Sequence, residues 1–390
     1  MTRPRTDDGI HAMVPRERMD PAAVKLRDTY AITPGAPIVH REFGYYCLDR
    51  WYEQGLPREP NLSEIFHYDP PGWHGLWGLG WCEAGFEPRF EERIIEDRGE
   101  YEVVQDFAGR HVLCFKGRRS GFMPEYLDHP VKDWKTWEEK CKWRLDPATP
   151  KRYQAIEETM AKPDGPVAAA RRGMMISQRL VGGYMYLRSL IGPAELLYMF
   201  YDQPGLIHEC MKTWFALADA VIAAHQKHVT IDEIYFGEDI CYNHGPLISP
   251  AMMREFILPY YQQLIANLKH RQIDQQRHLY VQIDTDGYAN PTIPVYQDAI
   301  GMDAMSPFEV ASGCDVVAIG KQYPRLAIFG GIDKRVLAQG KREIDAMVER
   351  IIPAMRARGG YIPTCDHGVP EEVSLENYMH YRTRCIELCG

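Results

Sequence analysis

The sequence places charged side chains directly after several short apolar runs. Carboxylic acids and histidine move protons in enzymes, and arginine holds a carboxylate with two hydrogen bonds. The residues with this chemistry are Arg41, Glu238, Asp239, Asp284, Asp286, Glu309, Asp333 and His367. We therefore expect a site for acid–base work on a small polar molecule.

Asp284 and Asp286 form the most informative pair, because a single residue separates them in the stretch that ends at Gly287. In an extended strand end, residues two apart face the same side, so both carboxylates can point at one ligand. Two nearby carboxylates raise each other's pKa, which suits a general acid, and they can alternatively bind a cation. The competing interpretation is a solvated turn.

His367 and Arg41 extend this pair. His367 lies between Asp366 and Gly368 after the last apolar run, and a neighbouring carboxylate can hold a histidine as acid, base or metal ligand. With Asp284 and Asp286 it can complete either a metal site or a metal-free acid–base set. Arg41 follows the first apolar run and can clamp a substrate carboxylate, whereas an ion pair with its neighbour Glu42 is the alternative.

Acidic residues after strands also have a structural use, because they cap the next helix by accepting from its free backbone N–H groups. Asp333, beside Lys334 and Arg335, fits such a cap or a surface ion pair. Glu238 and Asp239 follow an apolar run and lie far before the next helical segment, which favours a functional role.

The elements that position these groups are five short apolar runs that alternate with helical segments. The runs cover residues 233–236, 278–283, 302–305, 326–329 and 360–363. Strands that alternate with helices indicate a parallel sheet, and in a (β/α)8 TIM barrel all strand ends open on one face, where the polar groups would meet. A doubly wound open sheet is the alternative, but no GxGxxG turn follows the first predicted strand, at residues 36–40.

Two regions lie outside this alternation. Residues 94–116 alternate around the turn at 106–109, which predicts a β-hairpin inserted as a lid over the barrel. The aromatic cluster of Trp73, His74, Trp77 and Trp81 belongs either to the lid or to the core. The polar residues 1–35 are predicted to be an N-terminal arm, so the expected domains are this arm and a barrel over residues 36–390.

The composition excludes several classes of protein. The net charge of −9 opposes binding to nucleic acid, and no apolar run is long enough to cross a membrane. Ten cysteines without a CxxC pair are typical of reduced thiols, and the polar N-terminus lacks a signal peptide. We therefore expect a cytoplasmic protein with a small-molecule substrate.

Several motifs are shared with a known family. They are Gly245-Pro-Leu-Ile-Ser-Pro250, Gly330-Gly-Ile-Asp333, Gly360-Tyr-Ile-Pro363 with His367-Gly-Val-Pro370, Phe200-Tyr-Asp-Gln-Pro204, and the segment from Tyr184 to Gly192. Together they resemble the uroporphyrinogen decarboxylase superfamily over nearly the whole chain beyond residue 35. The resemblance implies a barrel enzyme, and superfamily precedent implies a homodimer.

The resemblance divides between two activities. Uroporphyrinogen decarboxylases carry an arginine-rich loop, a central aspartate and a late histidine; Arg41 and His367 match, but the second arginine and the aspartate have no match. The methyltransferase branch binds zinc through His-x-Cys and a last Cys, where this chain has Asp284-x-Asp286 and His367. A divalent metal such as zinc is therefore an open question.

Apart from these differences, the chain resembles the corrinoid-linked methyltransferases of this superfamily. We expect a methyltransferase that moves a methyl group from a small O- or N-methyl substrate to a corrinoid on a partner protein, because the chain lacks the Asp-x-His-x-x-Gly cobalamin signature. A carboxy-lyase with Arg41 as clamp, or a non-catalytic barrel subunit, are the alternatives. The catalytic set is Glu238, Asp286 and His367, and the substrate-binding set is Arg41, Tyr184, Asp239, Asp284 and Glu309.

Overall fold

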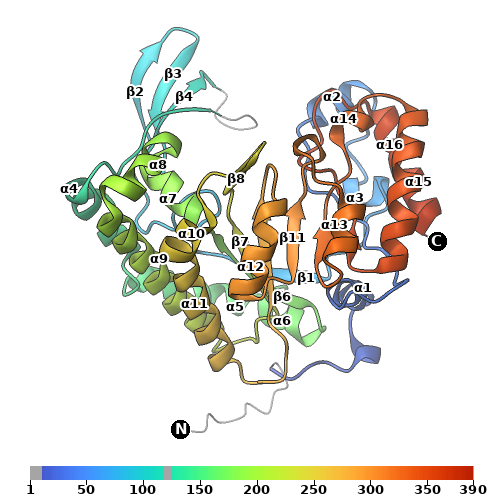
Figure 1. Cartoon of the computed structure of the whole chain (residues 1–390), viewed down its shortest axis with the longest axis horizontal. Coiled ribbons are helices and arrows are strands. Elements are labelled where there is room, and N and C mark those ends of the chain that lie inside the picture. Colours follow the sequence, from blue (N-terminus) through green and yellow to red (C-terminus); the bar gives the residue numbers. More distant parts are fainter. Residues whose placement is uncertain (1–10, 118–123, 390) are drawn as a thin grey trace.

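The computed structural model describes residues 11–117 and 124–389, and a curled parallel sheet forms their centre (Figure 1). Its seven strands run in the order β1-β6-β7-β10-β11-β12-β13. They are β1 (Trp73–Leu76), β6 (Met175–Val181), β7 (Glu233–Gly237), β10 (Tyr280–Thr285), β11 (Ala304–Pro307), β12 (Ala327–Phe329) and β13 (Tyr361–Ile362). The alternating pattern therefore predicted the α/β class and the parallel sheet correctly.

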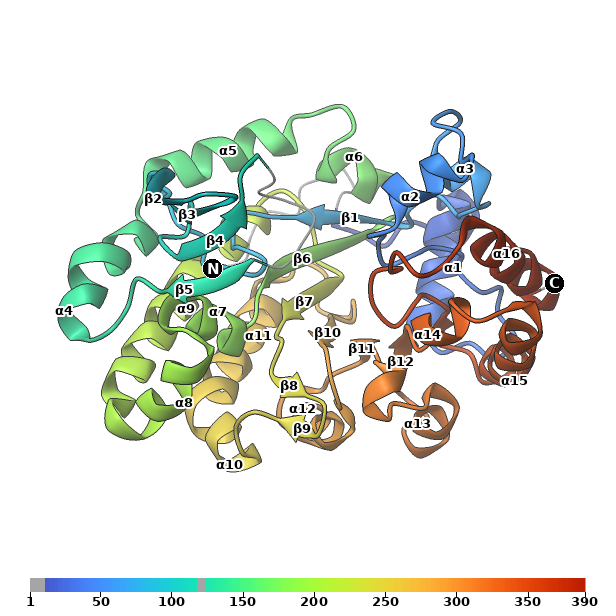
Figure 2. The ribbon, with the colours of Figure 1, turned by 90° about the horizontal axis from the view of Figure 1, so that it is seen from above.

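Helices cover the outer face of the sheet, as Figure 2 shows from above. The larger ones are α5 (Pro150–Met160), α8 (Pro193–Asp202), α9 (Pro204–His225), α11 (Leu258–Arg271), α12 (Ile293–Ile300), α13 (Val316–Gln322), α15 (Lys341–Arg358) and α16 (Leu375–Cys389). In α9 the buried side chains Leu206, Cys210, Trp214 and Leu217 recur at helical spacing. This apolar stripe packs the helix onto the sheet, so helix burial follows from the sequence period.

All five predicted runs with polar ends are confirmed as strands, each within two residues of its predicted limits. The first predicted strand is wrong. Residues 36–40 are not a strand, although Ile38 and Val39 are buried. The edge strand is β1 instead, and the apolar residues 166–172 mostly form the helix α6 (Pro166–Arg171).

The expected arm contributes to the body. The helix α1 (Pro21–Tyr30) buries Leu26 and Tyr30. The ring of Tyr30 lies 4.8 Å from that of Tyr280 and 5.4 Å from that of Phe329, and its hydroxyl donates to Gln282 at 3.0 Å. These partners come from strands, so α1 packs on the sheet. Residues 1–10 of the expected arm lie outside the described residues.

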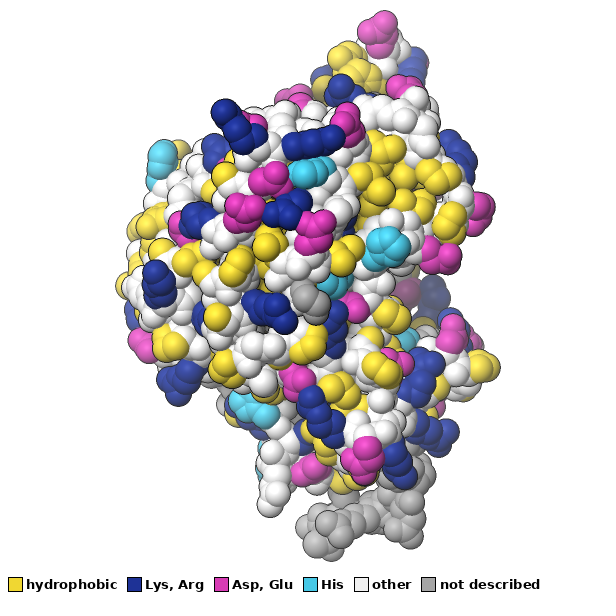
Figure 3. Space-filling view, turned by 90° about the vertical axis from the view of Figure 1, so that its right-hand side faces the viewer, with side chains coloured by type: hydrophobic (Ala, Val, Ile, Leu, Met, Phe, Trp, Pro, Cys, Tyr) yellow, Lys and Arg dark blue, Asp and Glu magenta, His cyan; other side chains and the backbone are white. Residues whose placement is uncertain are grey.

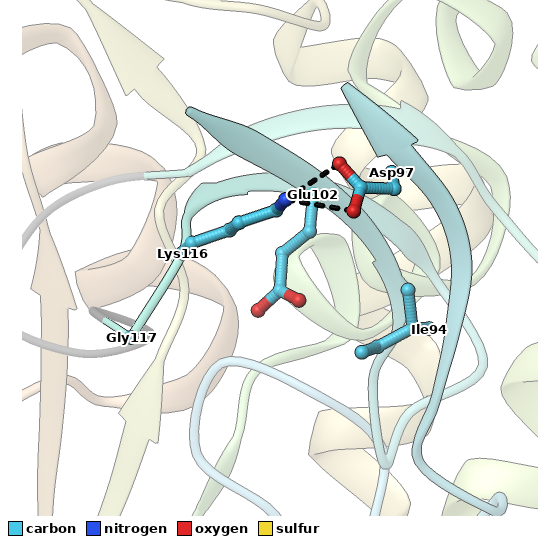
Figure 4. Close-up of a pocket in the computed structure, with 5 residues that line it drawn as sticks. All are labelled: Ile94, Asp97, Glu102, Lys116 and Gly117. Carbon is cyan, nitrogen blue, oxygen red and sulfur yellow. Dashed lines mark hydrogen bonds and ion pairs between the residues drawn. The ribbon is translucent and has the colours of Figure 1, made fainter. Parts of the chain in front are cut away.

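The predicted hairpin is confirmed as part of a four-stranded antiparallel sheet, formed by β2 (Arg93–Arg98), β3 (Tyr101–Gln105), β4 (His111–Phe115) and β5 (Glu125–Asp128). It projects from the body beyond α7 (Gly183–Ile191) and α8, at the upper left of Figure 1. A hollow of about 540 Å³ on this sheet contains the Asp97–Lys116 ion pair at 2.6 Å (Figure 4). Asp97 and Lys116 neutralise each other there, and the role of the sheet as a lid stays a prediction.

The outer surface carries no single dominant charge on the face shown in Figure 3, where acidic and basic side chains are interspersed. None of the helices in the described ranges is both long and apolar enough to cross a membrane.

Candidate active site

Two predicted site residues meet at the mouth, the end of the parallel sheet where the strands' carboxyl ends lie. Asp286 follows β10 directly, and His367 lies in the loop after β13. The His367 Nε2 atom lies 3.6 Å from a carboxylate oxygen of Asp286. This separation is longer than an ordinary hydrogen bond, as catalytic pairs often are before substrate arrives.

The surroundings of Asp286 favour its neutral acid form, although 37% of its side-chain surface is exposed. Burial, followed by the charges of Asp239, Asp284 and Glu309, raises its pKa to about 8, and Lys334 only partly opposes this rise. A carboxylic acid with such a pKa keeps its proton at neutral pH and can donate it to a leaving group. Asp286 therefore has the protonation state that a general acid needs.

His367 is held mainly as a neutral imidazole. Burial lowers its pKa, and the nearby Lys334 lowers it further. Two aromatic rings enclose it: that of Phe43 at 5.2 Å and that of Tyr46, stacked at 5.8 Å. The Tyr46 hydroxyl also lies 3.5 Å from His367 Nδ1. The ring is thus fixed on two sides while Nε2 faces Asp286.

Glu309 and Lys334 support this pair from the neighbouring strand ends. One oxygen of Glu309 accepts from the Gly287 N–H at 2.9 Å, and the other accepts from Lys334 Nζ at 3.0 Å. Asp366 is fully buried and accepts from the backbone N–H of Val310 at 2.9 Å and of Lys334 at 3.2 Å. Glu309 therefore fixes the turn that carries Asp286 and keeps a cation at the mouth.

Asp284 lies deeper, on the inner face of the sheet. It accepts from the Ser306 hydroxyl, and burial raises its pKa to about 6. Beside it, Arg179 lies 3.6 Å over the ring of Tyr235, which in turn stacks on Trp81 at 5.3 Å. Trp73 lies on β1, and Trp77 and Trp81 follow this strand, so the aromatic cluster borders the sheet interior and the mouth.

Arg41 faces the interior of the curled sheet. Its guanidinium lies 5.2 Å over the ring of Phe329, and burial lowers its pKa, while the charges of Tyr30 and Glu233 raise it. Within the described ranges Arg41 forms no ion pair, so the expected alternative of a pair with Glu42 is wrong. Its guanidinium keeps hydrogen-bonding capacity for a ligand carboxylate.

Glu238 and Tyr184 are buried at the start of α7. Both are fully buried, and Glu238 accepts from the Tyr184 N–H at 2.9 Å and from the Tyr261 hydroxyl. Glu238 thus accepts a hydrogen bond from a backbone N–H at the start of α7, and burial raises its pKa to about 7. Direct roles of Glu238 in catalysis and of Tyr184 in substrate binding stay predictions, and the geometry places neither beside Asp286.

Asp239 and Asp333 differ in surroundings. Asp239 has a φ of 48°, and its side chain pairs with Arg188 at 3.3 Å. Its charge is among the causes that raise the pKa of Asp286, so it faces the mouth. Asp333 accepts from the Arg335 N–H at 2.9 Å and caps α14 (Lys334–Leu337), which confirms the structural interpretation of this residue.

A metal does not fit the residues as they stand. In the described part of the chain, no group of three or more His, Cys, Asp or Glu side chains could hold a metal ion. Asp284 is bound to Ser306, while Asp286 and His367 face each other. The expected set of Asp284, Asp286 and His367 is therefore not assembled as a metal site in this structure.

Sequence reasoning missed several residues around the pair. The His367 ring is in contact with those of Phe43 and Tyr46, and the charge of Lys334 lowers its pKa. Arg179 lies deeper, over the ring of Tyr235. The segment after Arg41 contained part of this signal, because Phe43, Tyr45 and Tyr46 all lie within five residues of the expected clamp. Arg179 gave no such signal, because it lies inside a strand rather than after one.

Known proteins resemble this chain in sequence and in fold. Uroporphyrinogen decarboxylase from Geobacter metallireducens is 27% identical over 146 residues, which are 35% of this chain and 37% of that protein. The enzyme of the same name from Aromatoleum aromaticum is 25% identical over 194 residues, 48% of this chain and 51% of that protein. The chain thus matches between about a third and a half of the length of these relatives.

A solved structure extends the similarity of fold. A methyltransferase from Methanosarcina mazei has a TM-score of 0.55 at 14% identity, over 94% of this chain and 98% of that chain. The family model described as uroporphyrinogen decarboxylase (URO-D) matches residues 169–387, more than half of the 390 residues. The chain belongs to the uroporphyrinogen decarboxylase family.

Proposed function

We propose that the protein is a methyltransferase that demethylates a small O- or N-methyl compound. The observation that carries this proposal is the Asp286 carboxyl, which lies 3.6 Å from His367 at the mouth, where burial and acidic neighbours raise its pKa. Removal of a methyl group leaves an electron pair on oxygen or nitrogen, and a proton donor at that atom lowers the barrier. Membership of the uroporphyrinogen decarboxylase family supports an enzyme, while methyl transfer, the substrate and the acceptor are part of the proposal.

In the proposed reaction the bond between the methyl carbon and the substrate heteroatom breaks. The heteroatom keeps the electron pair and takes the proton of Asp286, and the methyl group leaves to a nucleophile. That nucleophile would be the reduced cobalt of a corrinoid on a partner protein. The neutral His367, whose Nε2 lies 3.6 Å from the Asp286 carboxylate, can accept a hydrogen bond from a substrate that enters between the two groups.

The rim of the mouth fits a flat ligand. The rings of Phe43, Tyr46, Trp77 and Tyr242 are exposed, although large aromatic side chains are usually covered. Such a surface can receive a corrinoid face or an aromatic substrate. A lid formed by β2–β5 and a homodimer belong to the same proposal.

The proposal is tested with cobalt(I) corrinoid and a panel of methoxylated and N-methylated compounds. We expect methylcobalamin and one demethylated product in equal amounts, and both should disappear with Asp286→Asn. A panel that yields no methylcobalamin from any compound would overturn the proposal.

The second candidate is a carboxy-lyase acting on a small acid. It is favoured by Arg41, which forms no ion pair among the described residues, and by the nearby Arg179, whose Nε is buried without a partner there. The two guanidinium groups can hold a substrate carboxylate while Asp286 supplies the proton that replaces carbon dioxide. Release of labelled carbon dioxide by the wild type and not by Arg41→Ala, without methyl transfer, would favour the lyase.

A further inference from the structure

β13 is an edge strand of the curled sheet, and a short segment pairs with the loop that follows it at the mouth. Tyr46 N–H donates to the Val369 carbonyl at 2.9 Å, and Val369 N–H donates to the Gly44 carbonyl at 2.8 Å. Among the described residues, Tyr45 and Val369 form the one β-bridge of this contact. We call residues 42–46 with 365–369 the seam. Two backbone bonds alone hold these segments together weakly.

Glu42 adds side-chain bonds to the seam. One carboxylate oxygen accepts from the N–H of Phe43 at 2.8 Å and of Cys365 at 2.7 Å. The other accepts from the hydroxyl of Tyr378 on α16 at 2.6 Å. Figure 2 shows α16 on the same side of the molecule as α2 (Leu48–Glu53), which follows the seam. One side chain thus joins both seam segments and a helix.

The groups that Glu42 joins are those that hold His367. Phe43 and Tyr46 flank the imidazole at 5.2 and 5.8 Å, and Cys365 precedes it by two residues. Displacement of either segment would turn the ring away from Asp286. We propose that Glu42 is a positioning residue that fixes the His367 imidazole by holding its loop against the Phe43 and Tyr46 rings.

The chemistry of the side chain defines a conservative replacement. Glutamine can accept both N–H groups on its one oxygen and can donate from its amide to the Tyr378 oxygen. Alanine removes all three bonds and leaves the N–H of the buried Cys365 without this partner, which is costly. Glu42→Gln should therefore keep the position of His367, and Glu42→Ala should lose it.

The test follows the ring protons of His367 by NMR in protein labelled at histidine, with His367→Gln to assign them. In Glu42→Ala we expect these signals to move towards those of a solvent-exposed histidine, because the flanking rings no longer shift them. Glu42→Gln should keep them near the wild-type positions. Leu26→Ala, a core truncation in α1, controls for lost stability and should leave them unchanged.

The inference rests on the proposed function only for its kinetic readout. A misplaced catalytic group costs on the order of 10²-fold, so the methyl-transfer kcat should fall by about that factor in Glu42→Ala. His367 signals that stay unchanged in Glu42→Ala would overturn the positioning role, whatever the activity. If Glu42→Ala does not fold, Glu42→Asp replaces it, because its shorter side chain cannot reach Cys365 and Tyr378 together.

Discussion

Asp286 and His367 lie 3.6 Å apart, and their shifted pKa values favour the same distribution of protons. The pKa of Asp286 is raised to about 8 and that of His367 is lowered, so at neutral pH the carboxyl carries the proton and the imidazole does not. Because the two groups face each other, the measured values will belong to the pair. A substrate atom that enters between them meets one donor and one acceptor.

The first prediction concerns the activity of Asp286→Asn. We expect kcat/KM for methyl transfer to fall by about 10²–10⁴-fold, because the amide has no acidic proton to donate. In the wild type, kcat/KM should fall as pH rises through about 8, where Asp286 loses its proton. Steady-state rates between pH 5 and about 10 check both. An unchanged rate in Asp286→Asn would remove this residue from the mechanism.

The second prediction concerns stability at the same residue. Because the folded-state pKa of Asp286 is raised from 3.8 to about 8, folding favours its protonated form. Its contribution is fully present below the lower value and is lost as pH rises through the higher one. At pH above 8 the melting temperature of Asp286→Asn should exceed that of the wild type by a few degrees. Asp298→Asn, an exposed site on α12, makes the same charge change and should have little effect.

The third prediction concerns the helix cap at Asp333. Its carboxylate accepts from the Arg335 N–H at 2.9 Å and also pairs with the Arg335 side chain at 2.8 Å. Asp333→Ala should lower the free energy of unfolding by about 1 kcal/mol, the usual cost of a lost N-cap, as urea denaturation can measure. A large loss of activity without this loss of stability would contradict a purely structural role.

Single residues were predictable where local chemistry decides. Asp333 beside two basic residues indicated a cap, and it is one. Glu238 gave the same kind of signal, but its direction depends on where α7 and Tyr261 lie, which no local pattern contains. Tyr46 reaches His367 across the seam, between residues 321 positions apart in sequence, so its role needed the fold.

At the scale of elements, strands were predictable where apolar and aromatic side chains predominate and a polar cluster follows. The β7 sequence Glu-Ile-Tyr-Phe-Gly has buried side chains at four of its five positions. In contrast, β6 contains Ser177, Gln178 and Arg179, and β1 is Trp-His-Gly-Leu, which lacks the β-branched residues typical of strands. A hydrophobicity pattern does not detect strands that carry polar groups on the inner face of the sheet.

The fourth prediction tests whether α1 is part of the body. Leu26 is 3% exposed and packs with side chains of the parallel sheet, so Leu26→Ala should cost about 2–5 kcal/mol of unfolding free energy. Val24→Ala, at a half-buried position of the same helix, is the matched control and should cost much less. Equal, small effects in urea denaturation would show that α1 behaves as an appended arm.

At the scale of the whole molecule, the polar groups concentrate at one end of the sheet because every parallel strand delivers its following residue there. Four carboxyl groups act on one another at this end, and Lys334 and Arg188 are the cations paired with two of them. A net excess of carboxyl groups is relieved either by protonation or by a bound cation. The raised pKa of Asp286 corresponds to relief by protonation.

The fifth prediction decides between these two solutions. Since no set of three ligands for a metal is assembled among the described residues, we expect elemental analysis of protein purified without chelators to find zinc and other divalent metals well below one equivalent per chain. Asp286→Asn, which removes the carboxyl group, should not change the amount of bound metal. Stoichiometric metal that is lost in the Asp286→Ala, His367→Ala double variant would instead mean that substrate-free protein rearranges these side chains around a cation. The acid role of Asp286 would then pass to a metal-bound group, and the high-pH fall in kcat/KM would depend on the metal.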